Sequence, residues 1–223
     1  MQSLNLYVST RNPHKLTELR ALLSPVGDFE VVTAEAAGVP DVEETGTTFL
    51  DNAVLKAAAA FRVTGGVCLA DDSGLVVDAL DGAPGVYSAR FSGPGATAAR
   101  NNAHLLRRLE GVEHTARTAA FVCHLALVVP TQLAVDAVAQ APIDHPDVPA
   151  GAVLYSLEGR VEGRILAAER GHGGFGYDPL FFYEPASMSF AEMGASDKNA
   201  VSHRGRALER LAGCLRSLTS AGS

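Results

Sequence analysis

Short apolar runs alternate with longer segments of helical periodicity through the first half of the chain, and this alternation constrains the fold more than any other feature. Apolar runs of strand length occur at Leu4–Ser9, Phe29–Thr33 and Val67–Ala70. Helical segments are expected to begin at Asn12-Pro13, to run from Thr47 to about Val63, and to cover Ala96–Leu109. Such alternation is typical of α/β domains, in which helices pack on the faces of a sheet.

The second half of the chain is richer in β-type sequence. Arg117–Val129 is a long β-type run, while Val153–Leu157 and Arg160–Ala167 flank Glu158-Gly159 in the pattern of a hairpin. A closing helix is expected from Ala195 to about Leu218. We therefore predict an α/β fold with a central mixed β-sheet flanked by helices.

Composition restricts the class of protein. The 223 residues, 47% hydrophobic and 19% charged, suit a single globular domain over residues 1–223 or two small lobes that share a core. A net charge of −7 argues against duplex DNA and anionic membranes as partners, because their binding depends on clustered Lys and Arg. No run approaches the roughly 20 apolar residues of a membrane span, and a signal-peptide pattern is lacking. Cys68, Cys123 and Cys214 lie in apolar contexts without metal-site spacing, which indicates buried thiols in a reduced, cytoplasmic protein.

One segment, Val138–Gly151, looks inserted. Its prolines interleave with Asp144, His145 and Asp147, and a loop of this length is unusual in a compact domain. We interpret it as an exposed excursion from the fold.

The junction between the first predicted strand and the first predicted helix is polar. Backbone N–H groups at a helix N-terminus attract anions, Thr10 and Asn12 add polar side chains, and Lys15 adds a positive charge. Taken alone, the junction is explained by an ordinary strand-to-helix turn with an Asn cap. A phosphate-binding loop, without the spacing of a P-loop, is the functional alternative.

Two adjacent carboxylates, Asp71 and Asp72, directly follow the apolar run Val67–Ala70. Buried carboxylates are costly to pack without a partner. Mg²⁺ is a suitable partner, because it takes one or two protein carboxylates and completes its shell with water and phosphate oxygens. An Asp-rich turn is the alternative.

A second acidic pair, Glu43-Glu44, precedes the second predicted helix. Acidic residues are favourable at a helix N-terminus in any case, so this pair alone predicts no site. Asn52 and Lys56 are four residues apart on that helix and share one face, where a lysine is usually solvated.

The C-terminal half carries a glycine-rich loop at Gly171–Pro179, which includes Phe175 and Tyr177. Glycine lets a ligand approach the backbone closely, and an aromatic ring can stack on a base. Lys198 and the His203-Arg204 pair follow with further polar and cationic groups. The remaining histidines show no zinc spacing, and the chain has no G-x-S-x-G nucleophile motif.

Taken in order, these segments resemble the inosine triphosphate pyrophosphatase family, whose bacterial members clear deaminated purine nucleotides. The resemblance extends from residue 4 to about residue 218. It rests on Thr10–Lys15, Glu43–Gly46, Phe49, Asn52, Ala53, Lys56, Ala57, Ala70–Gly74, Gly82–Phe91, Phe175–Pro179 and Ser202–Arg204. Each motif is weak alone, but the ordered set is highly specific.

This resemblance implies an elongated α/β fold with two lobes and a cleft between them, and a homodimer. It implies Mg²⁺-dependent hydrolysis of ITP, dITP and XTP to the monophosphate and pyrophosphate, which removes these nucleotides from the pool. Asp72 would be the catalytic base and a metal ligand, with Glu43 as the other metal carboxylate. Substrate contacts are expected from Thr10, Arg11, Asn12, Pro13, His14, Lys15, Ser73, Phe175, Gly176, Tyr177, Asp178, Lys198, His203 and Arg204. Further candidates are Asn52, Lys56 and Asp71.

Two features depart from the family pattern. Arg11 and His14 stand where relatives often have glycine or small residues, and Val138–Gly151 is longer than expected. Two other functions share part of this pattern. The first is a regulatory nucleotide-binding module without turnover, which needs no paired carboxylates and is disfavoured by Glu43 with Asp71 and Asp72. The second is a dinucleotide-dependent oxidoreductase, which needs GxGxxG after the first strand, where this chain has Ser9–Asn12.

Overall fold

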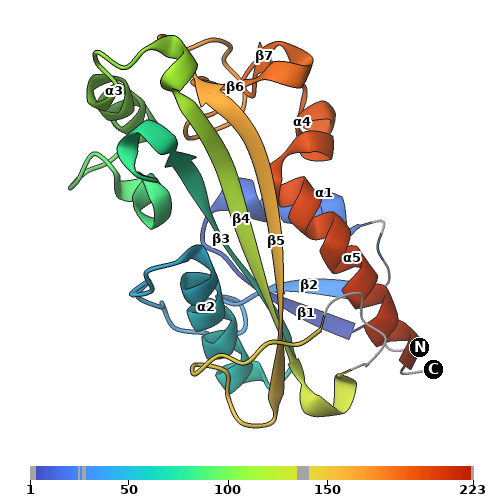
Figure 1. The fold of residues 1–223 in the computed structure, drawn as a ribbon. Coiled ribbons are helices and arrows are strands. Elements are labelled where there is room, and N and C mark those ends of the chain that lie inside the picture. The colour runs from blue at the N-terminus through green and yellow to red at the C-terminus, as the bar shows by residue number, and fades with distance from the viewer. Residues whose placement is uncertain (1–3, 25, 27–28, 135–140, 222–223) are drawn as a thin grey trace. The chain divides into compact units, whose positions relative to one another are not determined.

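The computed structural model describes residues 4–24, 26, 29–134 and 141–221, and its elements are labelled in Figure 1. The strands are β1 (Leu4–Ser9), β2 (Phe29–Thr33), β3 (Val67–Val77), β4 (Thr118–Pro130), β5 (Ala152–Ile165), β6 (Phe181–Tyr183) and β7 (Met188–Ser189). The α-helices are α1 (Pro13–Leu23), α2 (Phe49–Thr64), α3 (Ala98–Arg108), α4 (Ala195–Val201) and α5 (His203–Ala221). No helix in these described ranges is long and apolar enough to cross a bilayer.

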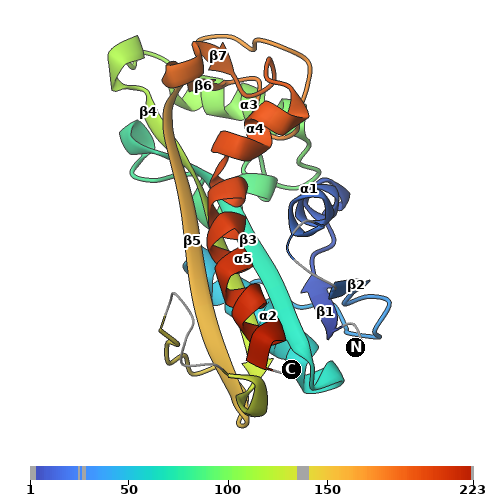
Figure 2. The same ribbon diagram turned by 90° about the vertical axis from the view of Figure 1, so that its right-hand side faces the viewer.

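The strands form one seven-stranded sheet in the order β2-β1-β3-β4-β5-β6-β7. The strand β1 runs parallel to both β2 and β3, whereas β5, β6 and β7 pair antiparallel. The long strands β3, β4 and β5 are visible in Figure 1 and in the turned view of Figure 2. The predicted α/β class with a mixed sheet is therefore confirmed.

Internal contacts divide the chain into two compact units. The first unit comprises Met1–Asp72, His124–Glu158 and Gly205–Ser223, and the second comprises Ser73–Cys123 and Gly159–Arg204. The strands β3, β4 and β5 each contribute residues to both units. The predicted single domain with two lobes and a cleft stays a prediction.

The core of the first unit lies where α2 packs on the sheet. Small side chains of α2, including Ala53 and Ala57, pack with Cys68 and Ala70 of β3 and with Ala126 of β4. Small residues allow a helix to approach the strands closely, which brings its polar side chains within reach of β3.

Local capping sets where the helices of the first unit begin. The Asn12 side chain accepts hydrogen bonds from the amides of His14 and Lys15, as the Asn12-Pro13 pair predicted. Helix α2 begins with a capping box, in which the side chains of Thr48 and Asp51 each accept a hydrogen bond from the other's backbone N–H.

Aromatic side chains dominate the core of the second unit. The ring centroids of Phe121 and Phe181 lie 4.7 Å apart, and those of Phe181 and Phe190 lie 4.9 Å apart. Leu75 and Tyr177 are buried in the same cluster. Tilted aromatic pairs at these separations stabilise a core beyond the area they bury.

Three sequence predictions about element boundaries were wrong. Strand β3 does not end at Ala70 but continues through the acidic pair to Val77, because partners on both faces hold the polar side chains. Glu158-Gly159 forms no hairpin turn and lies inside β5, where exposed and buried residues keep alternating. The predicted closing helix is two helices, because Ser202 has an extended backbone between α4 and α5. The three cysteines are free and buried, as predicted.

Candidate active site

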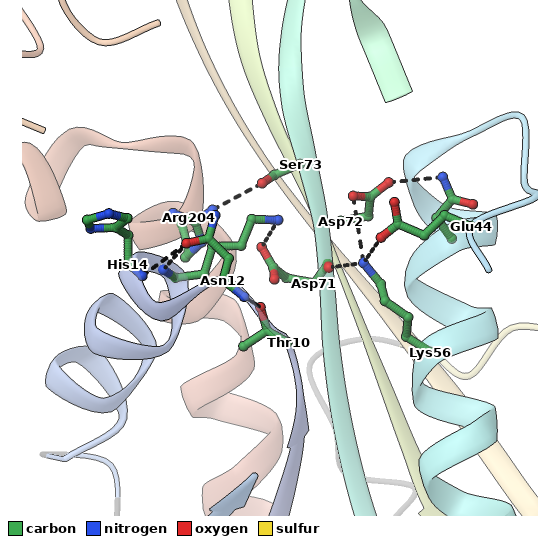
Figure 3. Close-up of polar contacts among 11 residues, drawn as sticks. Thr10, Asn12, His14, Glu44, Lys56, Asp71, Asp72, Ser73 and Arg204 are labelled. Atoms are coloured by element: carbon green, nitrogen blue, oxygen red, sulfur yellow. Dashed lines mark hydrogen bonds and ion pairs between the residues drawn. The ribbon is translucent and has the colours of Figure 1, made fainter. Parts of the chain in front are cut away.

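The two adjacent aspartates of β3 point to opposite faces of the sheet, as successive strand residues must. Both are buried, with 1% of Asp71 and 6% of Asp72 exposed. Asp71 Oδ2 lies 3.0 Å from Lys15 Nζ in α1, whereas Asp72 faces α2 (Figure 3). The pair therefore connects the sheet to a different helix on each face.

On the Asp72 face of the sheet, the Lys56 ammonium group of α2 lies close to several acidic groups. Lys56 Nζ donates to Glu44 Oε1 at 2.7 Å and to the carbonyl oxygen of Asp71 at 2.7 Å, and it lies 3.7 Å from Asp72 Oδ1 (Figure 3). Burial disfavours the charge on Lys56, but the three neighbouring carboxylates outweigh that cost and raise its pKa above the ordinary value. Lys56 is therefore protonated at neutral pH and faces Glu44 and Asp72.

Asn52 fixes the orientation of Asp72. Its side-chain amide donates to Asp72 Oδ2 at 3.2 Å, and its carbonyl oxygen accepts from the Gly46 N–H at 2.8 Å. The side chain is fully buried, so both hydrogen bonds are shielded from water. A Cβ on Gly46 would lie 2.8 Å from Asn52 Oδ1, so only glycine permits this approach. Asn52 thus connects the loop that carries Glu44 with the strand that carries Asp72.

The environment of Asp72 suits a proton acceptor. Burial raises the pKa of this carboxyl above its ordinary value, and the ammonium groups of Lys56 and Lys15 offset only part of the rise. A carboxylate of raised pKa has a greater affinity for a proton than an aspartate in water. Because its Oδ2 is held by Asn52, Asp72 is oriented as a general base requires.

The predicted phosphate loop has the structure of a capped helix start. Thr10 Oγ1 accepts from the Asn12 N–H at 3.3 Å, and Asn12 Oδ1 accepts from the amides of His14 and Lys15. Arg11 extends outward to an exposed ion pair with Asp41, at 2.9 Å. Pro13 and His14 are exposed. From this loop, Lys15 reaches the acidic pair of β3 and forms an ion pair with Asp71.

In the second unit, Asp178 organises the glycine-rich loop. Its Oδ2 accepts from Lys198 Nζ at 2.7 Å and from the Phe175 N–H at 2.7 Å. Lys198 Nζ also lies 4.7 Å from the centre of the Phe175 ring, a cation–π geometry. Asp178 and Lys198 are both buried, so this ion pair is shielded from solvent. A Cβ on Gly174 would collide with the Asp178 carboxylate.

The other predicted nucleoside contacts are built into the second unit. Tyr177 donates from its hydroxyl to the Ser88 carbonyl at 2.8 Å, and burial raises its pKa, so it is a packing residue. The His203 ring stacks on Phe121 with 4.9 Å between centroids. Arg204, 2% exposed, donates to Ser73 Oγ at 3.0 Å. Gly176 has a positive φ of 63°.

Sequence reasoning selected Glu43 as a metal carboxylate, yet the glutamate whose carboxylate contacts Lys56 is its neighbour Glu44. The Glu43 side chain is exposed, and its role stays a prediction. Only the path of the loop decides which of two adjacent glutamates faces α2. The pattern of the motif carries no signal for this choice.

His124 of β4 is a second group that sequence reasoning missed. Its Nε2 lies 3.7 Å from Glu158 Oε2, and its Nδ1 is buried without a hydrogen-bond partner in the described part of the chain. Burial lowers the pKa of this imidazole, although Glu158 and Asp72 oppose the shift. The apolar run around it gave no reason to select it.

The acidic groups of the first unit fit a hard divalent cation. No cluster of three or more His, Cys, Asp or Glu side chains in the described ranges has the arrangement of a metal site. Mg²⁺ needs only one or two protein carboxylates, however, with water and phosphate oxygens as the remaining ligands. Glu44 and Asp72 supply two carboxylates that already face one positive charge, the Lys56 ammonium.

Comparison with known proteins gives a consistent result. A family model described as the Ham1 family matches residues 6–214. The dITP/XTP pyrophosphatase of Geobacter sulfurreducens is 47% identical over 92% of this chain and 94% of its own length, and that of Desulforamulus reducens is 45% identical over 93% of each. The solved HAM1 protein from Coxiella burnetii is 38% identical, covers 95% of this chain and 98% of its own, and superposes with a TM-score of 0.80.

Proposed function

Because this chain belongs to the Ham1 family, we propose that it is a dITP/XTP pyrophosphatase, which hydrolyses noncanonical purine nucleoside triphosphates to the monophosphate and pyrophosphate. Its similarity to enzymes of that name extends over more than nine tenths of the chain. The observation that carries the proposal is the convergence of Glu44 and Asp72 on the Lys56 ammonium, because this places carboxylates and a cation together on one face of the sheet.

In the proposed reaction, a water oxygen bonds to the α-phosphorus while the bond from that phosphorus to the bridging oxygen breaks. Pyrophosphate leaves with the electron pair. Asp72 accepts the proton of the attacking water, since burial has raised its proton affinity. Lys15 and Lys56 stabilise negative charge on the triphosphate. Mg²⁺, held by Glu44 and Asp72, would supply further charge neutralisation when bound.

The Thr10–Lys15 loop is proposed to hold the polyphosphate. Asn12 already accepts hydrogen bonds from the amides of His14 and Lys15, and Lys15 is paired with Asp71, so the exposed Arg11 side chain is the more available cation. Arg11 has an exposed ion pair with Asp41, which is worth about 0–1 kcal/mol and can be replaced by an ion pair with a phosphate.

The nucleoside is proposed to bind residues of the second unit. Phe175, Lys198 and Arg204 would contact it, with Asp178 fixing both Phe175 and Lys198. Hypoxanthine and xanthine present an oxygen acceptor at position 6, where adenine presents an amino donor. Cationic donors such as Arg204 would be left unpaired against adenine, and that mismatch discriminates strongly.

A pyrophosphate-release assay tests the activity. With Mg²⁺, dITP, ITP and XTP should each give one pyrophosphate per monophosphate, EDTA should abolish release, and ATP should be a poor substrate. Binding without turnover would instead support a regulatory module. Orthophosphate as the released product would contradict the proposed cleavage of the α–β bond.

A pair of adjacent variants tests the acidic site. Glu44→Gln should lower kcat and raise the Mg²⁺ concentration needed for half-maximal activity, because its carboxylate lies beside Lys56. Glu43→Gln is the matched control, since the neighbouring side chain is exposed. If Glu43→Gln shows the larger effect, the original assignment of Glu43 as the metal carboxylate holds instead.

The homodimer, the Mg²⁺ preference and the cytoplasmic location belong to the same proposal. Light scattering of the purified chain tests the dimer, and activity with Mg²⁺ or Mn²⁺ at equal concentration tests the metal.

A further inference from the structure

The part of the predicted insertion that the structure describes, residues 141–151, is attached to the first unit. Residues 138–140 of the predicted Val138–Gly151 excursion lie outside the described residues. The Ile143 N–H donates to the Leu154 carbonyl at 3.0 Å, and Val148 packs against the core beneath α2. Arg62, in the last turn of α2, donates to the Asp147 carbonyl at 2.9 Å. The segment therefore contacts α2, while most of its residues are exposed.

His145 makes the contact at the other end of α2. The Asp147 N–H donates to its Nδ1 at 3.3 Å, which in a neutral ring leaves the proton on Nε2. Nε2 then donates to Asp51 Oδ1, at 3.3 Å. Only 12% of the imidazole is exposed, so both contacts are largely shielded from water.

Asp51 is a structural residue of the first turn of α2. Its second oxygen, Oδ2, accepts from the Thr48 N–H at 3.1 Å and from the Thr47 hydroxyl at 3.4 Å. Burial acts to raise the pKa of Asp51, but the hydrogen bonds from Thr48 and His145 outweigh it and lower the pKa below its ordinary value. The carboxylate is therefore ionised, and it is shared between the helix cap and the 141–151 segment.

The residue after Asp51 is Asn52, which orients Asp72 and holds the Gly46 N–H. A shift of the first turn of α2 would move the Asn52 amide relative to Asp72. The contact from His145 thus lies one residue from the group that orients the proposed catalytic base.

We propose that the 141–151 segment is a clamp on α2 and that His145 is a positioning residue for the pyrophosphatase reaction. This inference rests on the proposed function. His145 holds Asp51, Asp51 fixes the first turn of α2, and that turn places Asn52 against Asp72. Arg62 fastens the opposite end of the helix to the same segment.

Side-chain replacements separate positioning from mere packing. Glutamine places an N–H donor near the position of the imidazole Nε2, whereas asparagine reaches only as far as Nδ1. We expect His145→Ala and His145→Asn to lower kcat on dITP by about tenfold with KM changed less than about twofold, and His145→Gln to restore most of kcat. Asp144→Ala is the matched control, because Asp144 is exposed in the same segment. All assays are run well below the melting temperature of each variant.

Hydrogen exchange of the backbone amides of residues 51–56 gives a readout that does not depend on activity. Exchange should be faster in His145→Ala than in the wild type and should return toward the wild-type rate in His145→Gln. Unchanged exchange, kcat within twofold of wild type in all variants, or equal losses in the Ala and Gln variants would overturn the clamp. If the wild type releases no pyrophosphate while the exchange pattern holds, the proposed function fails and the clamp of α2 stands.

Discussion

Replacing Lys56 with methionine removes the ammonium group that holds the acidic face of β3 together and keeps the length of the side chain. In the wild type, Nζ contacts Glu44 Oε1 and the Asp71 carbonyl, both at 2.7 Å, and lies 3.7 Å from Asp72 Oδ1. The side chain of Glu44 is 29% exposed and can be hydrated again, whereas that of Asp72 is 9% exposed and cannot. Most of the cost therefore falls on Asp72.

Removing one partner of a buried ion pair costs about 3–5 kcal/mol, and the lower end applies here because Glu44 regains water. For a chain of this length, about 3 kcal/mol corresponds to a fall of about 6–12 °C in melting temperature. Without Lys56 the pKa of Asp72 should rise further. More of the carboxyl is then protonated at neutral pH and cannot accept a proton, so the variant should also lose turnover.

Thermal unfolding followed by circular dichroism at pH 7.5 measures the stability loss in Lys56→Met, in Glu44→Gln and in the double variant. The double variant should lose less stability than the sum of the two single losses, because the two groups interact. A melting temperature of Lys56→Met within about 1 °C of the wild type would refute the reasoning, since it would leave less than 1 kcal/mol for the buried ammonium.

Two further predictions concern other groups. Lys198→Met should lower the free energy of unfolding by about 3–5 kcal/mol, because it removes the ammonium group paired with the buried Asp178 carboxylate. Arg160→Met, which breaks an exposed ion pair, should change it by about 0–1 kcal/mol. Chemical denaturation of both variants measures the difference. Burial lowers the pKa of His124 below its ordinary value of 6.5 in the folded chain. The unfolded chain therefore binds a proton at this imidazole more tightly, and the folded state loses stability as the pH falls through 6.5 and below. His124→Asn should therefore show a smaller drop in melting temperature between pH 7.5 and pH 5.5 than the wild type, and equal drops would contradict this.

Features set by local chemistry were predictable from the sequence. The start of α1 follows from Asn12 and Pro13, because an Asn side chain satisfies helix N–H groups whatever the rest of the chain does. The bounds of β1 and β2 match the predicted runs, because short apolar stretches between helical segments usually form buried strands in an α/β domain.

Features set by distant partners were not predictable. The third strand was expected to end before Asp71 and Asp72, but Lys15 and Asn52 pair with these carboxylates and β3 continues through them. Glu158-Gly159 has the local sequence of a hairpin turn. Pairing with neighbouring strands, which a local pattern does not reveal, keeps β5 extended through these two residues.

The candidate site shows the same division. The order of motifs along the chain is sufficient to select Asp72 and Lys15 as candidate site residues and Lys56 as a further candidate. The choice between Glu43 and Glu44 depends on how one loop turns toward α2, and the contact between His145 and Asp51 joins residues 94 positions apart. Neither follows from a local pattern.

The rate of pyrophosphate release by Asp72→Asn tests the central claim most directly. Asparagine keeps the shape of the side chain but cannot accept the proton of the attacking water. With saturating dITP and Mg²⁺, the variant should remain folded by circular dichroism and lose at least about 100-fold in kcat. A folded variant with kcat close to that of the wild type would contradict the assignment of Asp72 as the base.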